Sequence, residues 1–175
     1  MVVITVSGTP GSGKSTVAKI LEKKLGIRYV YSGMIFRELA EKYKMSLEEF
    51  GKYCEENADI DKELDDQQLK ILKKGNVIVE GRLAGWLAYK NNISALKVML
   101  DADLDVRASR IVKREKGDKE KRKQEIIKRE KSESLRYKKY YDIDLKDNSI
   151  YDLVVDSGNK SSEQIADLII KEING

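Results

Sequence analysis

The chain has 175 residues, with 34 Lys and Arg against 30 Asp and Glu, a net charge of +4, one cysteine and no histidine. This length suits one domain with a hydrophobic core of its own. The single cysteine excludes an intramolecular disulfide and a cysteine metal cluster, and the lack of histidine excludes imidazole acid–base and metal-ligand chemistry.

The N-terminal segment carries the strongest motif. An apolar, β-branched run from Val2 to Ser7 leads into Gly8-Thr9-Pro10-Gly11-Ser12-Gly13-Lys14-Ser15-Thr16. This matches G-x-x-x-x-G-K-[ST], the phosphate-binding P-loop, in the required passage from strand to helix. We predict that residues 8–16 bind ATP; the alternative is a glycine-rich turn with a helix cap.

The physical basis of this prediction is local. Glycines let successive N–H groups turn inward around phosphate oxygens at the N-terminus of a helix. Lys14 adds a positive charge for the β- and γ-phosphates, and the Ser15 hydroxyl is placed to meet Mg²⁺. Lys14 is therefore a predicted catalytic residue and Ser15 a predicted metal ligand.

Helical and strand patterns alternate along the rest of the chain. Helical spacing of apolar residues at 17–25 and 36–43 flanks a short predicted strand at 28–31, which ends at Ser32-Gly33. Ser46 and Glu49 form a predicted capping box, and a further helical run extends through Leu72. Three more predicted strands, at 76–82, 96–101 and 152–157, precede or separate helical segments, the last of which opens at Ser161.

This alternation predicts an α/β fold with right-handed crossovers and a parallel sheet covered by helices on both faces. Ligands of such sheets bind beyond the carboxyl ends of the strands. The P-loop, Ser32-Gly33 with nearby Arg37, Glu80-Gly81-Arg82 and Asp101 all follow strand ends. We therefore expect them to face one cleft.

A basic segment follows the fourth predicted strand. Residues 107–139 hold fifteen Lys and Arg against six Asp and Glu. Arg107, Arg110 and Arg114 have the spacing of one helical face, where they repel one another unless an anion such as a triphosphate neutralises them. The alternative is a solvated basic face. Arg129, Glu133 and Arg136 share a second face, in a polar segment typical of a mobile lid.

Over nearly its whole length the chain resembles the nucleoside monophosphate kinases, and among them most closely the archaeal type of cytidylate kinase. The motifs that carry this resemblance run from the P-loop through Ser32-Gly33, Glu80-Gly81-Arg82 and Arg110-Ile111-Val112-Lys113-Arg114 to Val154-Val155-Asp156-Ser157. It implies a three-layer α/β/α P-loop kinase domain with a five-stranded parallel sheet. The implied parts are a core at 1–32, 75–106 and 150–175, a helical monophosphate-binding region at 33–74, and a lid with flanking helices at 107–149.

The resemblance also implies roles for particular residues. The implied monophosphate-binding residues are Ser32, Gly33, Arg37, Gly81, Arg82 and Glu133. Arg110 is expected over the ATP adenine, Arg114 at the phosphates, and Arg129 and Arg136 at the transferring phosphoryl group, which makes the last three predicted catalytic residues. Glu80 is expected to hold Mg²⁺ through water. Bacterial cytidylate kinases commonly carry Asp at the positions of Leu83 and Glu133.

The expected activity is transfer of the ATP γ-phosphoryl group to CMP or dCMP, with Mg²⁺ as cofactor. The attacking phosphate is already ionised near neutral pH, so the reaction needs no histidine base. An adenylate kinase, a uridylate kinase or another small-molecule P-loop kinase is the nearest alternative.

Two alternatives come from other classes. A GTPase switch is disfavoured because Asn159-Lys160-Ser161-Ser162 lacks the Asp of the guanine motif. An RNA-binding protein is disfavoured because the basic segment has no interleaved aromatic residues before Tyr137. No stable nucleic-acid partner is therefore expected.

The remaining expectations concern location and assembly. No run reaches the roughly 18 to 20 apolar residues of a membrane span, and the first apolar run lacks a basic leader. We expect a cytoplasmic monomer with no membrane partner.

Overall fold

A computed structural model describes the chain from residue 1 to 175, apart from the side-chain placement at positions 47, 48, 51, 55, 58, 61 and 132. Its five strands are β1 (Val3–Gly8), β2 (Arg28–Tyr31), β3 (Val77–Glu80), β4 (Leu96–Asp101) and β5 (Leu153–Asp156). They form one sheet in the order β2-β3-β1-β4-β5, and every neighbouring pair is parallel. The predicted five-stranded parallel sheet is confirmed.

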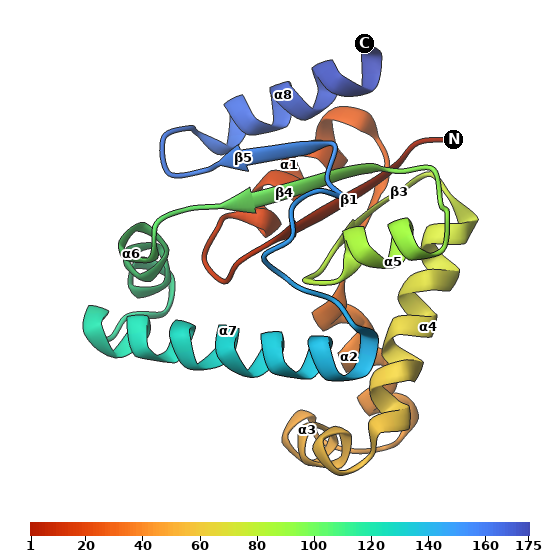
Figure 1. Cartoon of the computed structure of the whole chain (residues 1–175), viewed down its shortest axis with the longest axis vertical. Helices are drawn as coiled ribbons and strands as arrows, with labels where there is room; N and C mark the ends of the chain where they lie inside the picture. Colours follow the sequence, from red (N-terminus) through yellow and green to blue (C-terminus); the bar gives the residue numbers. More distant parts are fainter.

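The helices are α1 (Lys14–Leu25), α2 (Ser32–Lys42), α3 (Leu47–Glu56), α4 (Ala58–Lys74), α5 (Ala84–Lys90), α6 (Leu104–Glu115), α7 (Lys119–Tyr141) and α8 (Ser162–Asn174). In Figure 1, α1 and α8 cover one face of the sheet, while α5 and α4 lie on the other. The predicted three-layer α/β/α arrangement is therefore present. Side-chain capping boxes open α3 at Ser46 and α8 at Ser161, as the sequence predicts.

Alternation along β1 and β3 separates two hydrophobic cores. Ile4, Val6 and Ile78 point into the core under α1 and α8, whereas Val3 and Val79 point into the core under α2, α4 and α5. All five side chains are buried. Because successive side chains of a strand face opposite sides, a sheet covered on both faces reads as an unbroken apolar run.

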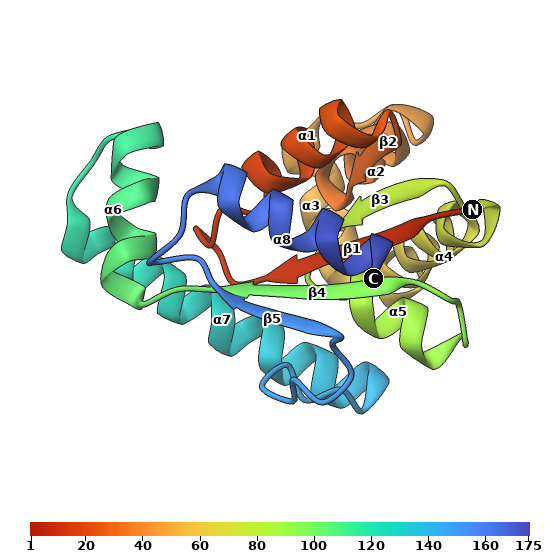
Figure 2. The ribbon, with the colours of Figure 1, turned by 90° about the horizontal axis from the view of Figure 1, so that it is seen from above.

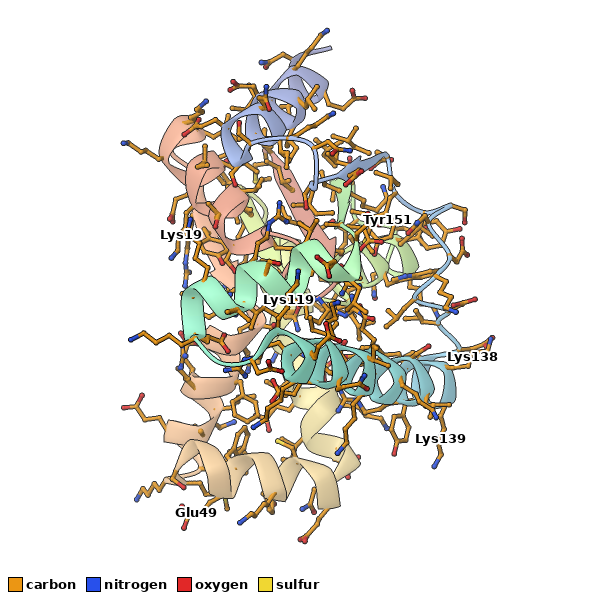
Figure 3. All side chains as sticks on the ribbon, turned by 90° about the vertical axis from the view of Figure 1, so that its left-hand side faces the viewer. Lys19, Glu49, Lys119, Lys138, Lys139 and Tyr151 are labelled. Carbon is orange, nitrogen blue, oxygen red and sulfur yellow. The ribbon has the colours of Figure 1, made fainter. Side chains whose placement is uncertain are left out.

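The carboxyl ends of the strands are the functional edge of the sheet. In Figures 1 and 2, α6 lies beyond the end of β4, and α7 runs from α6 back across the molecule toward α4 and α5. Figure 3 views this edge, with Lys119 near the start of α7 and Lys138 and Lys139 near its end. The end of α7 is anchored by the Tyr141 hydroxyl, which donates to Asp65 of α4.

Two of the regions that were predicted from the sequence each contain a group of successive helices. Residues 33–74 contain α3, α4 and all but the first residue of α2, and residues 107–149 contain α7 with most of α6. The division into a core, a monophosphate-binding region and a lid stays a prediction. Over the part of the chain that the structure describes, no helix is both long and apolar enough to cross a membrane.

Candidate active site

The P-loop packs too closely against its surroundings for side chains at Gly8 and Gly11. A Cβ on Gly8 would lie 2.2 Å from the Leu100 carbonyl oxygen of β4. Gly13, the N-cap of α1, has φ 91°, in the left-handed region that favours glycine. The loop therefore keeps its amides at the helix N-terminus, where the helix dipole favours an anion.

The Lys14 side chain packs against the same loop. Its Nζ donates to the Thr9 carbonyl oxygen at 2.9 Å, so the ammonium group lies over the space that the loop encloses. Burial lowers the pKa of Lys14 from 10.5 to about 8, an effect that Glu80 opposes and that Arg82 and Arg129 reinforce. A bound polyphosphate would restore the ordinary pKa by supplying nearby negative charge.

Ser15 and Glu80 meet at the mouth of the loop. Ser15 Oγ donates to Glu80 Oε1 at 3.1 Å, and the buried Tyr29 hydroxyl donates to Glu80 Oε2. Burial, followed by the bond to Glu80, raises the pKa of Tyr29, which keeps its hydroxyl a donor. Tyr29 therefore fixes the direction of the Glu80 carboxylate.

This pair of oxygen donors fits Mg²⁺. No three His, Cys, Asp or Glu side chains among those described form a candidate metal cage. Mg²⁺ bound with a nucleotide commonly uses only one or two protein oxygens and completes its shell with phosphate and water. Ser15 and Glu80 supply such a set beside the P-loop.

Across from Lys14, two arginines share one carboxylate. Arg82 Nε donates to Glu133 Oε2 at 2.7 Å, and Arg129 Nε donates to Glu133 Oε1 at 2.9 Å. A second Arg82 nitrogen, Nη1, donates to the Gly8 carbonyl oxygen at 2.9 Å. Arg82 and Glu133 are almost fully enclosed, with side chains 13% and 9% exposed. The strand-end arginine and α7 are thus tied together directly above the P-loop.

A cleft of about 390 Å³ lies between these groups. It gathers many of the predicted residues, namely Pro10, Gly11, Gly13, Lys14, Ser15, Thr16, Ser32, Glu80, Gly81, Arg82, Arg114 and Arg129. Gly8 and Glu133 reach it through their bonds to Arg82. Thr9 lies beside it, where its hydroxyl donates to Asp101 at 2.7 Å.

A second cavity of about 340 Å³ opens on the other side of the P-loop. Ser12, Arg110, Lys113 and Ser157 are among the residues that line it. The Arg110 guanidinium donates to the Ser157 carbonyl oxygen at 2.6 Å and to its hydroxyl at 3.0 Å. This flat cation is therefore held against the wall of a cavity that adjoins the phosphate loop.

The position of the Arg107 side chain differs from the one predicted from the sequence. Its side chain is buried and donates to the carbonyl oxygens of Ala102 at 2.8 Å and Pro10 at 3.3 Å, and to Glu130 at 2.7 Å. It therefore supports the P-loop from behind, and neither a triphosphate face nor a solvated basic face describes it. Arg110 and Arg114 remain beside the two cavities.

Besides Gly8, Thr9 and Glu133, three more predicted residues are absent from the lining of both cavities. Gly33 lies in the first turn of α2, where a Cβ would lie 3.1 Å from the Tyr31 ring. Arg37 is exposed and donates to the Tyr31 hydroxyl at 2.7 Å. Arg136 is exposed on α7 and lies over the Tyr137 ring at 5.0 Å.

Sequence reasoning missed Arg122, which lines the larger cleft. Arg122 pairs with Glu125 at 2.8 Å and donates to the Lys116 carbonyl oxygen at 3.1 Å. A signal was present, because Arg122 precedes Arg129 by seven residues and so shares its helical face. No comparable pattern marks Tyr29, which reads as an ordinary strand residue.

The sheet order, the P-loop after β1 and the cleft beyond the strand ends define the fold of a P-loop kinase. Solved structures agree with this fold at low sequence identity. An uncharacterized protein from Eubacterium ventriosum matches with a TM-score of 0.76 and 20% identity, covering 100% of this chain and 99% of that one. Shikimate kinase from Bacteroides thetaiotaomicron matches with a TM-score of 0.67 and 15% identity, covering 99% of each chain.

The chain belongs to the cytidylate kinase-like family, whose profile matches residues 3–159. A protein of Methanocaldococcus jannaschii named cytidylate kinase is 45% identical over 173 residues, which cover 98% of this chain and 97% of that protein. One of Archaeoglobus fulgidus with the same name is 47% identical over 171 residues, covering 97% and 93%. These relatives confirm the resemblance read from the motifs.

Proposed function

We propose that this protein transfers the γ-phosphoryl group of ATP to CMP, and also to dCMP, giving ADP and the nucleoside diphosphate. One observation carries the proposal: the cleft is lined both by the P-loop and by Ser32, Gly81 and Arg82, which follow two other strands. A phosphate donor and a phosphate acceptor can thus face each other across it. Membership of the cytidylate kinase-like family supports CMP as the acceptor.

The donor end of the cleft is assigned to ATP. The P-loop amides and Lys14 bind the β- and γ-phosphates, and the cavity beside Arg110 and Ser157 has the position and flat cationic wall suited to the adenine. Mg²⁺, held by Ser15 and through water by Glu80, would neutralise charge on the phosphates. Thr9, Ser12 and Thr16 complete the loop around the donor.

The acceptor end is assigned to the nucleoside monophosphate. Ser32, Gly33, Arg37, Gly81 and Arg82 provide amides, a hydroxyl and two guanidinium groups for an incoming phosphate. An acceptor oxygen attacks the γ-phosphorus while the bond to the β–γ bridging oxygen breaks and its electrons remain on ADP. The attacking oxygen carries its charge before the reaction, so no side chain has to remove a proton.

The basic residues of α6 and α7 supply the charge that this reaction needs. Two polyanions must approach in line, and fixed cations lower the free energy of the transition state by balancing the negative charge. Arg114 and Arg129 line the cleft already. Arg136 lies outside it, so its assigned catalytic role requires α7 to move when both nucleotides are bound.

The pairing of the basic segment argues against the RNA-binding alternative. Asp105 accepts from Lys119 and Lys123, and Arg122 pairs with Glu125. Arg107 and Arg129 likewise pair with Glu130 and Glu133. These five cations are thus paired within the protein, whereas nonspecific RNA binding depends on cations available to phosphates.

A coupled assay with ATP, Mg²⁺ and a panel of CMP, dCMP, UMP, AMP and GMP tests the proposal. We expect the highest kcat/KM with CMP or dCMP. The Lys14→Ala variant, purified in the same way, is the control for contaminating kinases. Preference for UMP or AMP would reassign the acceptor, and lack of turnover with every nucleotide would overturn the kinase assignment. The cytoplasmic location and the monomeric state stay predictions.

A further inference from the structure

Gln68 is a buried polar residue on the inner face of α4. Only 6% of it is exposed, and its neighbours on this face of the helix include Leu72, which is 1% exposed. Its side-chain oxygen Oε1 is buried and has no hydrogen-bond partner among the described residues. Burying an unpaired amide oxygen is unfavourable, and most buried polar groups in proteins are paired. The buried, unpaired oxygen of Gln68 indicates that its hydrogen-bond donor comes from outside the chain.

The position of this oxygen is beside the acceptor wall of the cleft. A Cβ on Gly81 would lie 3.2 Å from Gln68 Oε1 and 3.7 Å from Ser32 Oγ. Gly81 and Ser32 both line the cleft. Because Gly81 has no side chain, no Cβ fills the space between the amide oxygen and the hydroxyl. Gln68 therefore stands next to the part of the cleft assigned to the acceptor nucleotide.

The helix that carries Gln68 is held firmly in place. One turn later on the same helix, Leu72 is buried in the core shared with β3. The amide thus extends from a rigid element rather than from a loop. Groups held in this way discriminate between ligands better than mobile ones do, because the protein does not relax to suit the wrong ligand.

The chemistry of the oxygen selects the type of ligand atom. A carbonyl oxygen only accepts hydrogen bonds, so its partner must carry a hydrogen. The 4-amino group of cytosine is such a donor, whereas uracil has a carbonyl oxygen at that position and would repel Oε1. The ribose hydroxyls are donors too, and the 2′-hydroxyl distinguishes CMP from dCMP. An ionised phosphate offers no hydrogen.

We propose that Gln68 determines acceptor specificity by receiving a hydrogen bond from the 4-amino group of cytosine. The inference rests on the proposed function and extends it to one residue. Gln68 touches the base and not the reacting phosphates, so it governs the choice between pyrimidines rather than the rate of phosphoryl transfer. Leu83, buried among Trp86, Ile143 and Ile150, offers no hydrogen-bonding group for this purpose.

The test compares Gln68→Met with Gln67→Met. Methionine matches the length of glutamine and removes the acceptor, and Gln67 is the adjacent, less buried residue of the same helix. For Gln68→Met we expect kcat/KM to fall about tenfold with CMP and dCMP, and not with UMP. The KM for ATP stays unchanged. The melting temperature stays equal or rises, because an unpaired buried oxygen has been removed.

Gln67→Met should alter none of these values by more than about twofold. Gln68→Glu is a second variant, which keeps oxygen acceptors at the same distance from the backbone. It should retain the preference for CMP over UMP even where the added charge lowers both activities. If Gln68 had only a structural role, its substitution would lower activity with CMP and UMP alike. A change in the preference for CMP over UMP therefore distinguishes a contact with the base from a structural role.

Several outcomes overturn the assignment. Equal losses with CMP and UMP, no loss with CMP, or a loss limited to CMP that spares dCMP each exclude a contact with the 4-amino group. If Gln68→Met does not fold, loss of the CMP preference in Gln68→Glu excludes it as well. Wild-type protein that phosphorylates no cytidine nucleotide refutes the proposed function itself, a result distinct from an unaltered ratio in an active variant.

Discussion

The two halves of the cleft are built by different means. The donor half consists of consecutive residues, Gly8 to Thr16, whose shape depends on glycine backbone and on close packing against β4 and Arg107. The acceptor half draws Ser32, Gly81 and Arg82 from two connections after different strands, and α7 closes over it. Backbone forms the first half, and side chains from distant segments form the second.

This difference shows in how each half manages charge before any ligand binds. The P-loop presents backbone amides, and Lys14 donates to the Thr9 carbonyl oxygen, an uncharged partner within the loop. In the acceptor half, the Glu133 carboxylate already pairs with both Arg82 and Arg129. A monophosphate that reaches these arginines must therefore compete with a carboxylate. We infer that the donor half is preformed and that the acceptor half rearranges on binding.

Lys14→Ala gives the largest expected effect and probes the donor half. Removing the ammonium group should lower kcat by more than about a thousandfold, because the charge acts on the phosphates as they pass through the transition state. Steady-state kinetics with saturating ATP and CMP measure the loss. Lys19→Ala, an exposed lysine on the same helix, is the control and should retain full activity.

A kcat for Lys14→Ala within tenfold of the wild-type value would contradict the donor assignment. It would mean that the P-loop amides alone stabilise the transferring group. The donor half would then act through its backbone amides alone, and the Lys14 side chain that the motif specifies would contribute nothing.

Arg37→Ala gives the next largest effect and separates the halves. Arg37 lies next to Tyr31 after β2, on the acceptor side, so its loss should raise the KM for CMP by about 10- to 100-fold, the value of a charged hydrogen bond. The KM for ATP should change less than twofold. Measuring both constants in one variant compares the halves directly.

Lys42→Ala on the same helix serves as the control, since Lys42 pairs with Glu63 away from the cleft. Equal increases in the two Michaelis constants for Arg37→Ala would refute the assignment of Arg37 to the acceptor. Arg37 would then be a surface residue whose role is limited to its contact with Tyr31.

The sequence predicted the donor half residue by residue because its determinants are contiguous. A strand, three glycines, Lys14 and Ser15 at fixed spacing specify one backbone path, and the structure follows it. The sheet could be predicted for a similar reason: each strand is a short apolar run, and the alternation with helices leaves few topologies. These patterns express local geometry, which a sequence displays directly.

Contacts that join distant positions were predicted less completely, in both halves of the cleft. The spacing of Arg107, Arg110 and Arg114 correctly placed them on α6, but spacing along a helix does not reveal which surface that helix meets. Arg107 therefore turned out to support Pro10 from behind. Tyr29 and Gln68 gave no signal, since a strand tyrosine and a helical glutamine acquire meaning only from Glu80 and Gly81 across the fold.

The pH dependence of ATP capture provides a smaller and graded effect in the donor half. Lys14 has a pKa of about 8 in the free protein, lowered chiefly by burial. Below pH 8 the amine is protonated and ready to meet phosphate. Above pH 8 it must first take up a proton, so kcat/KM for ATP should fall by about tenfold for each pH unit.

Saturation with ATP should move this decline to higher pH in kcat, because bound phosphates raise the pKa of Lys14. The Lys14→Arg variant is the control: a guanidinium stays charged, so its residual activity should not fall in the same range. A flat kcat/KM profile between pH 7 and 10 for the wild type would be incompatible with a lowered pKa at Lys14.

Tyr29→Phe gives the smallest expected effect and tests the boundary between the halves. Tyr29 donates to Glu80 Oε2 while Ser15 donates to Oε1, so the carboxylate is held from both sides. Phenylalanine keeps the buried ring and its stacking on Tyr31, whose centroid is 5.7 Å away, and removes only the hydroxyl. Stability should therefore change little, while Glu80 gains freedom to turn.

A less fixed Glu80 should raise the Mg²⁺ concentration for half-maximal activity by about three- to tenfold, in line with the loss of one hydrogen bond to a group that positions a metal. At saturating Mg²⁺ most activity should return. Tyr89→Phe, which removes an exposed hydroxyl on α5, is the control. If Tyr29→Phe lowers kcat at every Mg²⁺ concentration alike, then Tyr29 supports the P-loop as Arg107 does, and the position of Glu80 does not depend on it.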